Sequence, residues 1–540
     1  MSSKTNHMAR IIGFLALIFL SGCAFSETND KGSAHNWQEL GVDPQDAIFL
    51  VGSQPRTMDP AQTLGGPDSA LGHIFSGLVM LDANMQVQPD LAAGWEVSED
   101  GLQYTFFLNP GARFHDGRAL TAQDVVYSWE RAADPLTGSD TVLTYLGNIA
   151  GVSEKLSGAA QQIEGLRVID DGSFTVRLSE PDVTFLAKLA YPVAFVVDRE
   201  NVASANWEHT PNGSGPFKLQ TWQDDDLILL ERNDGYYGDP ARVSHVAYDL
   251  GPGLPLSRYE TGQIDLVGIG SSTLERVQDP NSELHDDLQT MVTMCTSTIG
   301  LNNQLPPFDD ARVRQAFNYA LDKERLIETF SGGNALAANG PLPPGMPGYG
   351  GLDGESYPYD VEKARALLAE AGYEDPADLG PLTFTTQGYG DIGPYITAVI
   401  TLWQEALGVT IEPVLLEPFT YYDELYAGNT GHFFSSGWCA DYPDPQNFLE
   451  VLYHTGSEQN LSRFSDAGID ELLDQARVEQ DVSRRLAMYQ EAERRIVAEA
   501  PVVFTNHDIS AVLASPALEG YKLTPIGVPQ WHRVSKQRDS

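Results

Sequence analysis

Basic residues are scarce in this chain of 540 residues. Lysine and arginine together number 33, against 75 aspartates and glutamates, so the formal net charge is −42. Proteins bind nucleic acid through patches of Lys and Arg, and the sequence has no stretch rich in them, so nucleic acid is not expected as a partner. A solvated acidic surface explains the imbalance, and a cleft that attracts cationic ligands is the alternative.

Hydrophobic runs long enough to cross a bilayer are also missing. The apolar residues 11–20 follow Lys4 and Arg10 and fall short of the roughly 20 residues that a spanning helix needs. This pattern is typical of a secretory signal, and it ends in Leu20-Ser-Gly-Cys23, which resembles a bacterial lipobox. We therefore predict a lipoprotein signal peptide at 1–22, a lipid on Cys23 and a tether at 23–45. The protein would then be a membrane-anchored lipoprotein of the periplasm or cell surface; the alternative is an ordinary cleaved signal with an incidental cysteine.

Motifs for catalysis are missing as well. The sequence contains no His-Glu-x-x-His, no Gly-x-Ser-x-Gly and no phosphate-binding Gly-x4-Gly-Lys-Ser/Thr. His115 and Asp116 are adjacent, but no second metal ligand follows at helical spacing. The many carboxylates could supply an acid/base pair, so a secreted hydrolase is the alternative hypothesis. We predict a protein that is not an enzyme and uses no cofactor or metal.

The most informative segment lies at residues 432–448. An apolar run ends at Trp438, Asp441 follows three residues later, and Pro443 and Pro445 stop any regular element. A carboxylate next to an indole and the phenol of Tyr442 suits a ligand with an ammonium end, because the aromatic rings shield the ion pair from water. The plainer interpretation is an aspartate that caps a turn beside a core tryptophan.

The residues Trp438-Cys-Ala-Asp-Tyr442 resemble the signature of the oligopeptide-binding proteins of ABC importers, family 5 of the bacterial solute receptors. The resemblance implies that Asp441 receives the α-amino group of a peptide and that Cys439 is bonded to a distant cysteine. The chain has three cysteines, so a lipid on Cys23 leaves Cys295 and Cys439 as a pair in an oxidising compartment. The resemblance implies a disulfide between them; two free buried thiols are the alternative.

Further ligand-binding residues are assigned around this core. Trp438, Cys439 and Tyr442 flank Asp441, and Phe419 lies upstream of it. The family has a strand that runs along the ligand backbone after a Leu-Asp-Pro motif, which corresponds here to Leu64, Gly65 and Gly66. The two glycines allow the close approach of another chain, and a surface turn would use them equally well.

Strands and helices alternate along the chain without an internal repeat, which indicates an α/β fold with mixed sheets. We expect strands at 47–52, 194–197, 293–303 and 502–505, and helices at 395–407 and 483–500, among others. The resemblance implies a periplasmic binding protein-like fold of type II, cluster C, with three lobes and a hinge. Lobe I would combine 46–72, 196–294 and 512–540, lobe II would span 73–195, and lobe III would span 295–511.

The sequence departs from the family pattern at the other end of the ligand. Oligopeptide receptors hold the peptide carboxylate with basic side chains, and one such arginine corresponds to Ser435 here. Residues 419–437 contain no Lys or Arg, and no Lys lies between Lys323 and Lys363. The missing basic residues leave the length and class of the ligand open: an amidated, branched, basic or murein-derived peptide would fit, as would a carboxylate held by Arg or backbone N–H groups elsewhere. From the resemblance we predict a monomeric receptor that delivers an oligopeptide or peptide-like ligand to the permease subunits of an ABC transporter. The same fold binding a murein peptide, a nickel chelate, haem or an oligosaccharide is the alternative.

Overall fold

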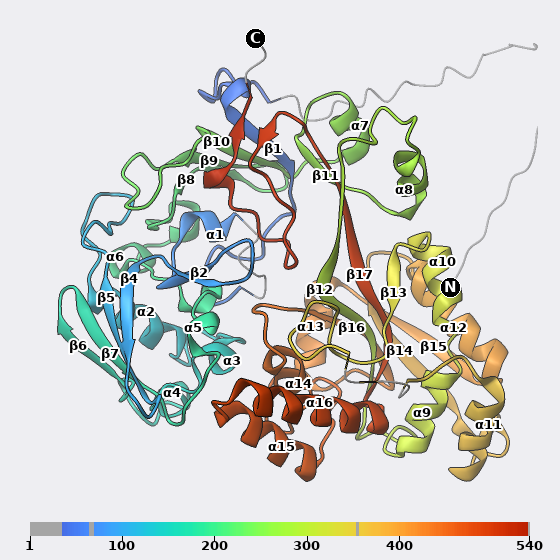
Figure 1. The fold of residues 1–540 in the computed structure, drawn as a ribbon. Helices are drawn as coiled ribbons and strands as arrows, with labels where there is room; N and C mark the ends of the chain where they lie inside the picture. The colour runs from blue at the N-terminus through green and yellow to red at the C-terminus, as the bar shows by residue number, and fades with distance from the viewer. Residues whose placement is uncertain (1–34, 64–69, 351, 353–355, 538–540) are drawn as a thin grey trace, which may run out of the picture.

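The computed structural model describes residues 35–63, 70–350, 352 and 356–537 (Figure 1). The predicted signal peptide, Cys23, Leu64, Gly65 and Gly66 lie outside the described residues. The fold is α/β, as expected, and it is built on a mixed eleven-stranded sheet in which β13 (Ala335–Ala337) pairs with β17 off the main path. The order of the other strands is β15 (Thr410–Leu416), β14 (Pro381–Gln387), β16 (Phe433–Cys439), β12 (Leu288–Leu301), β17 (Val502–Ala514), β11 (Leu266–Gly268), β1 (Ala47–Val51), β10 (His245–Asp249), β9 (Leu227–Arg232) and β8 (Phe217–Gln223).

Two long antiparallel strands, β12 and β17, connect the two ends of this sheet (Figure 1). Near one end, residues 288–292 of β12 pair with residues 509–513 of β17, and β17 also pairs with β11 on its other side. At the other end, Cys295 to Leu301 of β12 pair with β16. The register between β12 and β17 shifts between Val292 and Thr296, which marks an irregular point midway along the pair.

We use the names lobe I, lobe II and lobe III for three parts of the chain, each of which is built around its own buried residues. In lobe I, alternate residues of β1 face opposite ways: Ile48 and Leu50 join one cluster, whereas Ala47 and Phe49 join another. Burial on both faces explains why β1 is a continuous apolar run. The helices of this lobe are α1 (Leu71–Ile74), α6 (Arg199–Val202), α7 (Pro255–Glu260) and α8 (Ser271–Gln278).

Lobe II contains a separate antiparallel sheet, in the order β4 (Ala92–Val97), β5 (Gln103–Leu108), β7 (Ser173–Arg177) and β6 (Leu166–Asp170). Helix α2 (Ala122–Ala132) buries Trp129 against Phe174 of this sheet. Asp124 accepts a hydrogen bond from the Thr121 backbone N–H at 2.8 Å, as in a capping box at the start of the helix. The remaining elements are β2 (Val79–Leu81), β3 (Val87–Pro89), α3 (Val142–Leu146), α4 (Val152–Leu156) and α5 (Phe185–Lys188).

Lobe III packs its helices around the ring of Phe433, which contacts Phe317 and Trp403. Helix α12 begins with Pro394 and ends before Gly408 in the left-handed conformation (φ 78°), which is the usual pattern of helix boundaries. The helices of this lobe are α9 (Ala311–Tyr319), α10 (Lys323–Ser331), α11 (Val361–Glu370), α12 (Pro394–Leu407), α13 (Pro418–Ala427), α14 (Gln446–Tyr453), α15 (Ala467–Val478) and α16 (Val482–Glu499).

Some expectations about local structure were wrong. Residues 194–197 form no strand: a 3-10 turn, Pro192–Ala194, precedes extended chain, because Pro192 limits pairing there. The predicted tether is too long, since Trp37 packs on Phe49 (ring centroids 4.8 Å apart) and Val42 is buried. The exact boundaries of the predicted lobes remain predictions.

Candidate functional site at the end of β16

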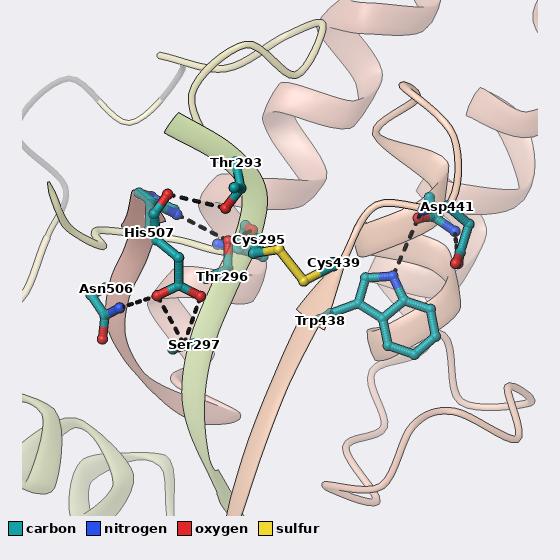
Figure 2. Close-up of a disulfide and its surroundings, with 12 residues drawn as sticks. Thr293, Cys295, Thr296, Ser297, Trp438, Cys439, Asp441, Asn506 and His507 are labelled. Carbon is teal, nitrogen blue, oxygen red and sulfur yellow. Dashed lines mark hydrogen bonds between the residues drawn. A yellow bond between two sulfur atoms is a disulfide. The ribbon is translucent and has the colours of Figure 1, made fainter. Parts of the chain in front are cut away.

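The site is built on β16, which lies between β14 and β12. Cys439 is the last residue of β16, and it faces Cys295 of β12 across the antiparallel pair. The two cysteines form a disulfide, as predicted (Figure 2). This bond fixes the end of β16, and therefore the start of the segment that carries Asp441, to one of the two long connecting strands.

A network of side chains sets the direction of the Asp441 carboxylate. Asn447, in α14, accepts hydrogen bonds from the Asp441 backbone N–H (2.9 Å) and from the Trp438 indole N–H (3.2 Å). Its amide nitrogen donates to Asp441 Oδ2 at 3.2 Å. Between these residues, Asp444 forms a two-point ion pair with Arg485 (2.6 and 2.7 Å), and both side chains are largely buried. The loop is thus held at both of its ends.

A tyrosine from lobe II reaches the same carboxylate. The hydroxyl of Tyr145, in α3, donates to Asp441 Oδ2 at 2.6 Å. The Tyr145 ring is stacked on Tyr191, with centroids 3.8 Å apart. Burial raises the pKa of Tyr145 far above its usual value, and the negative charge of Asp441 raises it further, so the phenol keeps its proton and remains a donor. The candidate site therefore lies between lobes II and III.

Two cavities adjoin this region. The smaller, about 80 Å³, is lined by Asp441 together with residues of lobes I and II and of the C-terminal segment. The larger, about 530 Å³, lies between lobe I and α13 of lobe III. Neighbouring residues at the start of α1 line the two: Gly72 and His73 line the smaller cavity, whereas Ala70 and Leu71 line the larger. The two cavities are therefore close together along this segment.

The predicted ligand-binding residues occupy different positions. Asp441 lines the smaller cavity, and Phe419, 55% exposed, lines the larger. Trp438 is half-buried and lines a third cavity of about 30 Å³ beside β12. Cys439 is committed to the disulfide. Tyr442 is fully buried in the core of lobe II and donates its hydroxyl proton to Gln446, so in this structure it connects lobes II and III rather than lining a cavity.

The sequence did not single out Tyr145, Tyr191 or Asn447. Tyr145 lies 296 residues before Asp441, and no local motif around it indicates that the two meet. Asn447 lies only six residues after Asp441, within the segment 432–448 that the sequence analysis singled out. An Asn next to a turn could have been recognised there as a hydrogen-bonding partner.

Basic groups near the cavities are few. Ser435, where the family pattern has an arginine, lies 3.0 Å from the Thr386 hydroxyl. Arg56 is the one Lys or Arg among the described residues that line the larger cavity, and its guanidinium lies 5.8 Å from the centroid of the Phe419 ring. The sequence analysis did not identify Arg56, because it follows a strand in an ordinary turn.

The adjacent residues His115 and Asp116, considered in the sequence as possible metal ligands, make structural hydrogen bonds. His115 Nε2 lies 3.1 Å from the Gly215 carbonyl oxygen, and burial lowers the pKa of His115 to about 4. Asp116 accepts a hydrogen bond from the Arg118 backbone N–H. Within the described ranges, no group of three or more His, Cys, Asp or Glu side chains is arranged to hold a metal ion. Over the same ranges, we find no helix with the length and apolar character required to span a bilayer.

Comparison with known proteins identifies the family. Residues 86–460 match the family model described as bacterial extracellular solute-binding proteins, family 5 Middle. The chain belongs to this family. Among its family 5 relatives, the periplasmic oligopeptide-binding protein OppA of Salmonella typhimurium is 31% identical over 502 residues, which cover 89% of this chain and 90% of that protein.

Similar solved structures also bear on the arrangement of the lobes. The structure of the Escherichia coli murein tripeptide binding protein MppA superposes with a TM-score of 0.81 at 26% identity, covering 91% of this chain and 98% of that one. The unliganded open form of MppA gives only 0.68 at the same identity, covering 91% and 97%. The arrangement of the lobes in this chain is therefore less similar to the open form than to the first MppA structure. The contact between Tyr145 and Asp441 agrees with this.

Proposed function

We propose that this protein is a receptor for peptides with a free amino terminus, which it encloses between its lobes and delivers to an ABC permease. The observation that carries the proposal is the position of Asp441: a half-buried carboxylate, oriented by Tyr145 and Asn447, at a cavity lined from all three lobes. Both of these donors are neutral, so they orient the carboxylate and leave its negative charge in place. An α-ammonium can then form a charge-assisted hydrogen bond with it.

The rest of the ligand would extend toward the larger cavity. Phe419 and Tyr422 supply aromatic surface there, and Arg56 supplies one positive charge. In this proposal Arg56 receives the peptide carboxylate and replaces the basic residues that the sequence lacks around Ser435. A volume of about 530 Å³ leaves room for side chains and water, which favours low selectivity for peptide sequence.

The route of delivery follows from the amino terminus. A lipid on Cys23 would keep the protein at the membrane surface, where an ABC permease could receive the ligand. We propose no catalytic step, because the residues around Asp441 bind and orient. The similarity to the murein tripeptide binding protein MppA makes a murein peptide the second candidate ligand, and it would use the same carboxylate.

Native mass spectrometry of the purified protein tests this proposal. The protein is mixed with an equimolar pool of tri- to pentapeptides, and separately with the same pool acetylated at the amino terminus. We expect complexes with the free-amine pool and few or none with the acetylated pool. Equal binding of both pools, or binding of neither, would contradict the proposed function. Mass analysis of any molecule released on denaturation would distinguish a murein peptide from an ordinary one.

A further inference from the structure

The smaller cavity carries more negative charge than one α-ammonium requires. Its described lining includes three aspartates, Asp82, Asp90 and Asp441, and no lysine or arginine. Asp82 is committed to the turn between β2 and β3, where it accepts the backbone N–H groups of Asn84 and Gln86. Asp90 has no such role in a turn, so it needs another explanation.

Asp90 follows β3 and is held by hydroxyl groups. It accepts hydrogen bonds from Tyr236 (3.4 Å) and from Tyr237. Burial raises the pKa of Asp90 to about 6, although the two tyrosines and Ser76 act in the opposite direction. Within the described part of the chain Asp90 forms no ion pair. Its carboxylate is therefore oriented but not neutralised, at a cavity where a cation would be stabilised.

A second polar group in the same cavity has a ring nitrogen without a hydrogen-bond partner among the described residues. His73, in α1, is 4% exposed, and its Nε2 atom has no hydrogen-bond partner among the described residues. Burial, and to a lesser extent the neighbouring His532, lower the pKa of His73 to about 3, so the imidazole is neutral. A neutral imidazole can accept a hydrogen bond at the ring nitrogen that carries no proton. A buried polar atom without a partner is costly, and a donor on the ligand would remove that cost.

The remaining lining is apolar and the space is small. A cavity of about 80 Å³ accommodates the end of one side chain rather than a peptide segment. Its walls include six apolar residues that an alkyl chain could contact: Phe75, Val79, Leu81, Ala190, Phe195 and Ile526. An alkyl stem with an ammonium at its end matches both the walls and the charge.

We propose that this cavity is a second cation subsite, in which Asp90 and His73 receive an ammonium on the side chain of the ligand's first residue. The α-ammonium of that same residue binds Asp441, so the inference rests on the proposed function and adds specificity to it. The preferred ligands are then peptides that begin with lysine or a shorter diamino acid. A ligand with an anionic first side chain would be repelled by the three carboxylates.

Two matched peptide sets test the inference by titration calorimetry. One set contains tri- to pentapeptides in which an amino-terminal lysine is followed only by alanines, and the other replaces that lysine with norleucine, which keeps the alkyl stem and removes the ammonium. We expect the wild-type protein to bind the lysine set at least about tenfold more tightly, since hydrogen bonds to charged groups contribute on this scale. In Asp90→Asn, which can still accept from Tyr237, that preference should fall to less than about threefold while norleucine peptides bind as before.

Control variants separate the possible failures. Asp234→Asn removes a carboxylate from the same turn as Tyr236, but Asp234 is 82% exposed and pairs with Arg232, so the lysine preference should persist. Equal affinity of the wild-type protein for the two sets would overturn the subsite, whatever the variants do, and an unchanged preference in Asp90→Asn would overturn the role of Asp90. If neither set binds, the proposed function itself fails, and the subsite fails with it.

Discussion

Single residues decide how this protein would distinguish ligands. Asp441 is presented by a loop that the disulfide, Asn447 and the ion pair of Asp444 with Arg485 hold in place. Its charge is oriented before any ligand arrives, which lowers the cost of ordering on binding. The same argument makes Arg56 the residue to test at the opposite end, because it lies exposed at the larger cavity.

Replacing Arg56 by glutamine should weaken the binding of peptides that have a free carboxylate. A hydrogen-bonded pair with a charged group contributes about 1.5–3 kcal/mol, so we expect roughly a 10- to 100-fold rise in Kd. Peptides amidated at the carboxyl end should bind the wild-type protein and Arg56→Gln alike. Calorimetry with one peptide in both forms measures this difference, and an equal loss for both forms would exclude Arg56 as the carboxylate partner.

A second prediction at this scale concerns pH. Glu493 in α16 is 1% exposed, and burial raises its pKa to about 7 from an ordinary 4.5. Between these values the folded protein holds a proton that the unfolded chain releases, so the free energy of unfolding should fall as the pH rises from 4.5 through 7. Glu493→Gln should remove part of this dependence and unfold less easily than wild type at pH 8, with the two proteins more similar at pH 5. Urea denaturation at both pH values tests this, and parallel profiles would contradict it.

At the scale of elements, local patterns predicted most helices and the short buried strands. The expected helix at 395–407 corresponds to α12, and the expected strand at 47–52 corresponds to β1. Strand β17 was predicted at four residues, 502–505, but it extends over thirteen, Val502–Ala514. Its middle contains Asn506 and Asp508, which are typical of turns, and pairing with β12 outweighs that preference.

Contacts between distant parts of the chain are also the reason why the candidate site was predictable only in part. Asp441 and the disulfide came from a local motif and a cysteine count, which a sequence displays directly. Tertiary packing brings Tyr145, Arg56 and Asp90 to Asp441 and the two cavities. No spacing in the sequence relates these three residues to Asp441. The burial of Tyr442 could not be predicted from the sequence either, since an aromatic residue after a loop aspartate suits a ligand pocket and the core of a lobe equally well.

The disulfide between β12 and β16 should stabilise the fold. Its loop spans 144 residues, and the chain-entropy model gives up to about 5 kcal/mol for a loop of this size. We expect the double variant Cys295→Ala/Cys439→Ala to unfold at a lower urea concentration, with a loss of about 2–5 kcal/mol in the free energy of unfolding. Chemical denaturation measures this, and a loss below about 1 kcal/mol would show that the strand pairing alone holds the end of β16.

At the scale of the whole molecule, contacts across the lobes stabilise the arrangement seen here. Arg477 of α15, in lobe III, forms an ion pair with Glu180 of lobe II at 2.6 Å, and Glu450 lies 3.7 Å from the same guanidinium. These residues line a cavity of about 380 Å³ between the two lobes, and Asp441 is not among its lining residues. The pair can therefore influence closure without touching the ligand proposed above.

Arg477→Ala should shift the molecule toward an open arrangement. Glu180 is 40% exposed, so solvent screens the pair and its contribution is about 1 kcal/mol or less. We expect ligand affinity to fall by up to about fivefold, with a larger radius of gyration in X-ray scattering without ligand and little change in the saturated complex. A matched control is Arg495→Ala, which removes an exposed pair within α16 alone. Identical scattering curves for Arg477→Ala and wild type would contradict the role in closure.

The most direct test of the account is calorimetry of Asp441→Asn with a peptide that the wild-type protein binds, in its free-amine and acetylated forms. Removing one partner of a buried charge pair costs about 3–5 kcal/mol, so we predict that Kd for the free-amine form rises by a few hundred-fold or more. The acetylated form should bind both proteins equally weakly, and the melting temperature should stay close to that of the wild type. Unchanged affinity of folded Asp441→Asn for the free-amine peptide would contradict the central claim that this carboxylate receives the ligand's amino terminus.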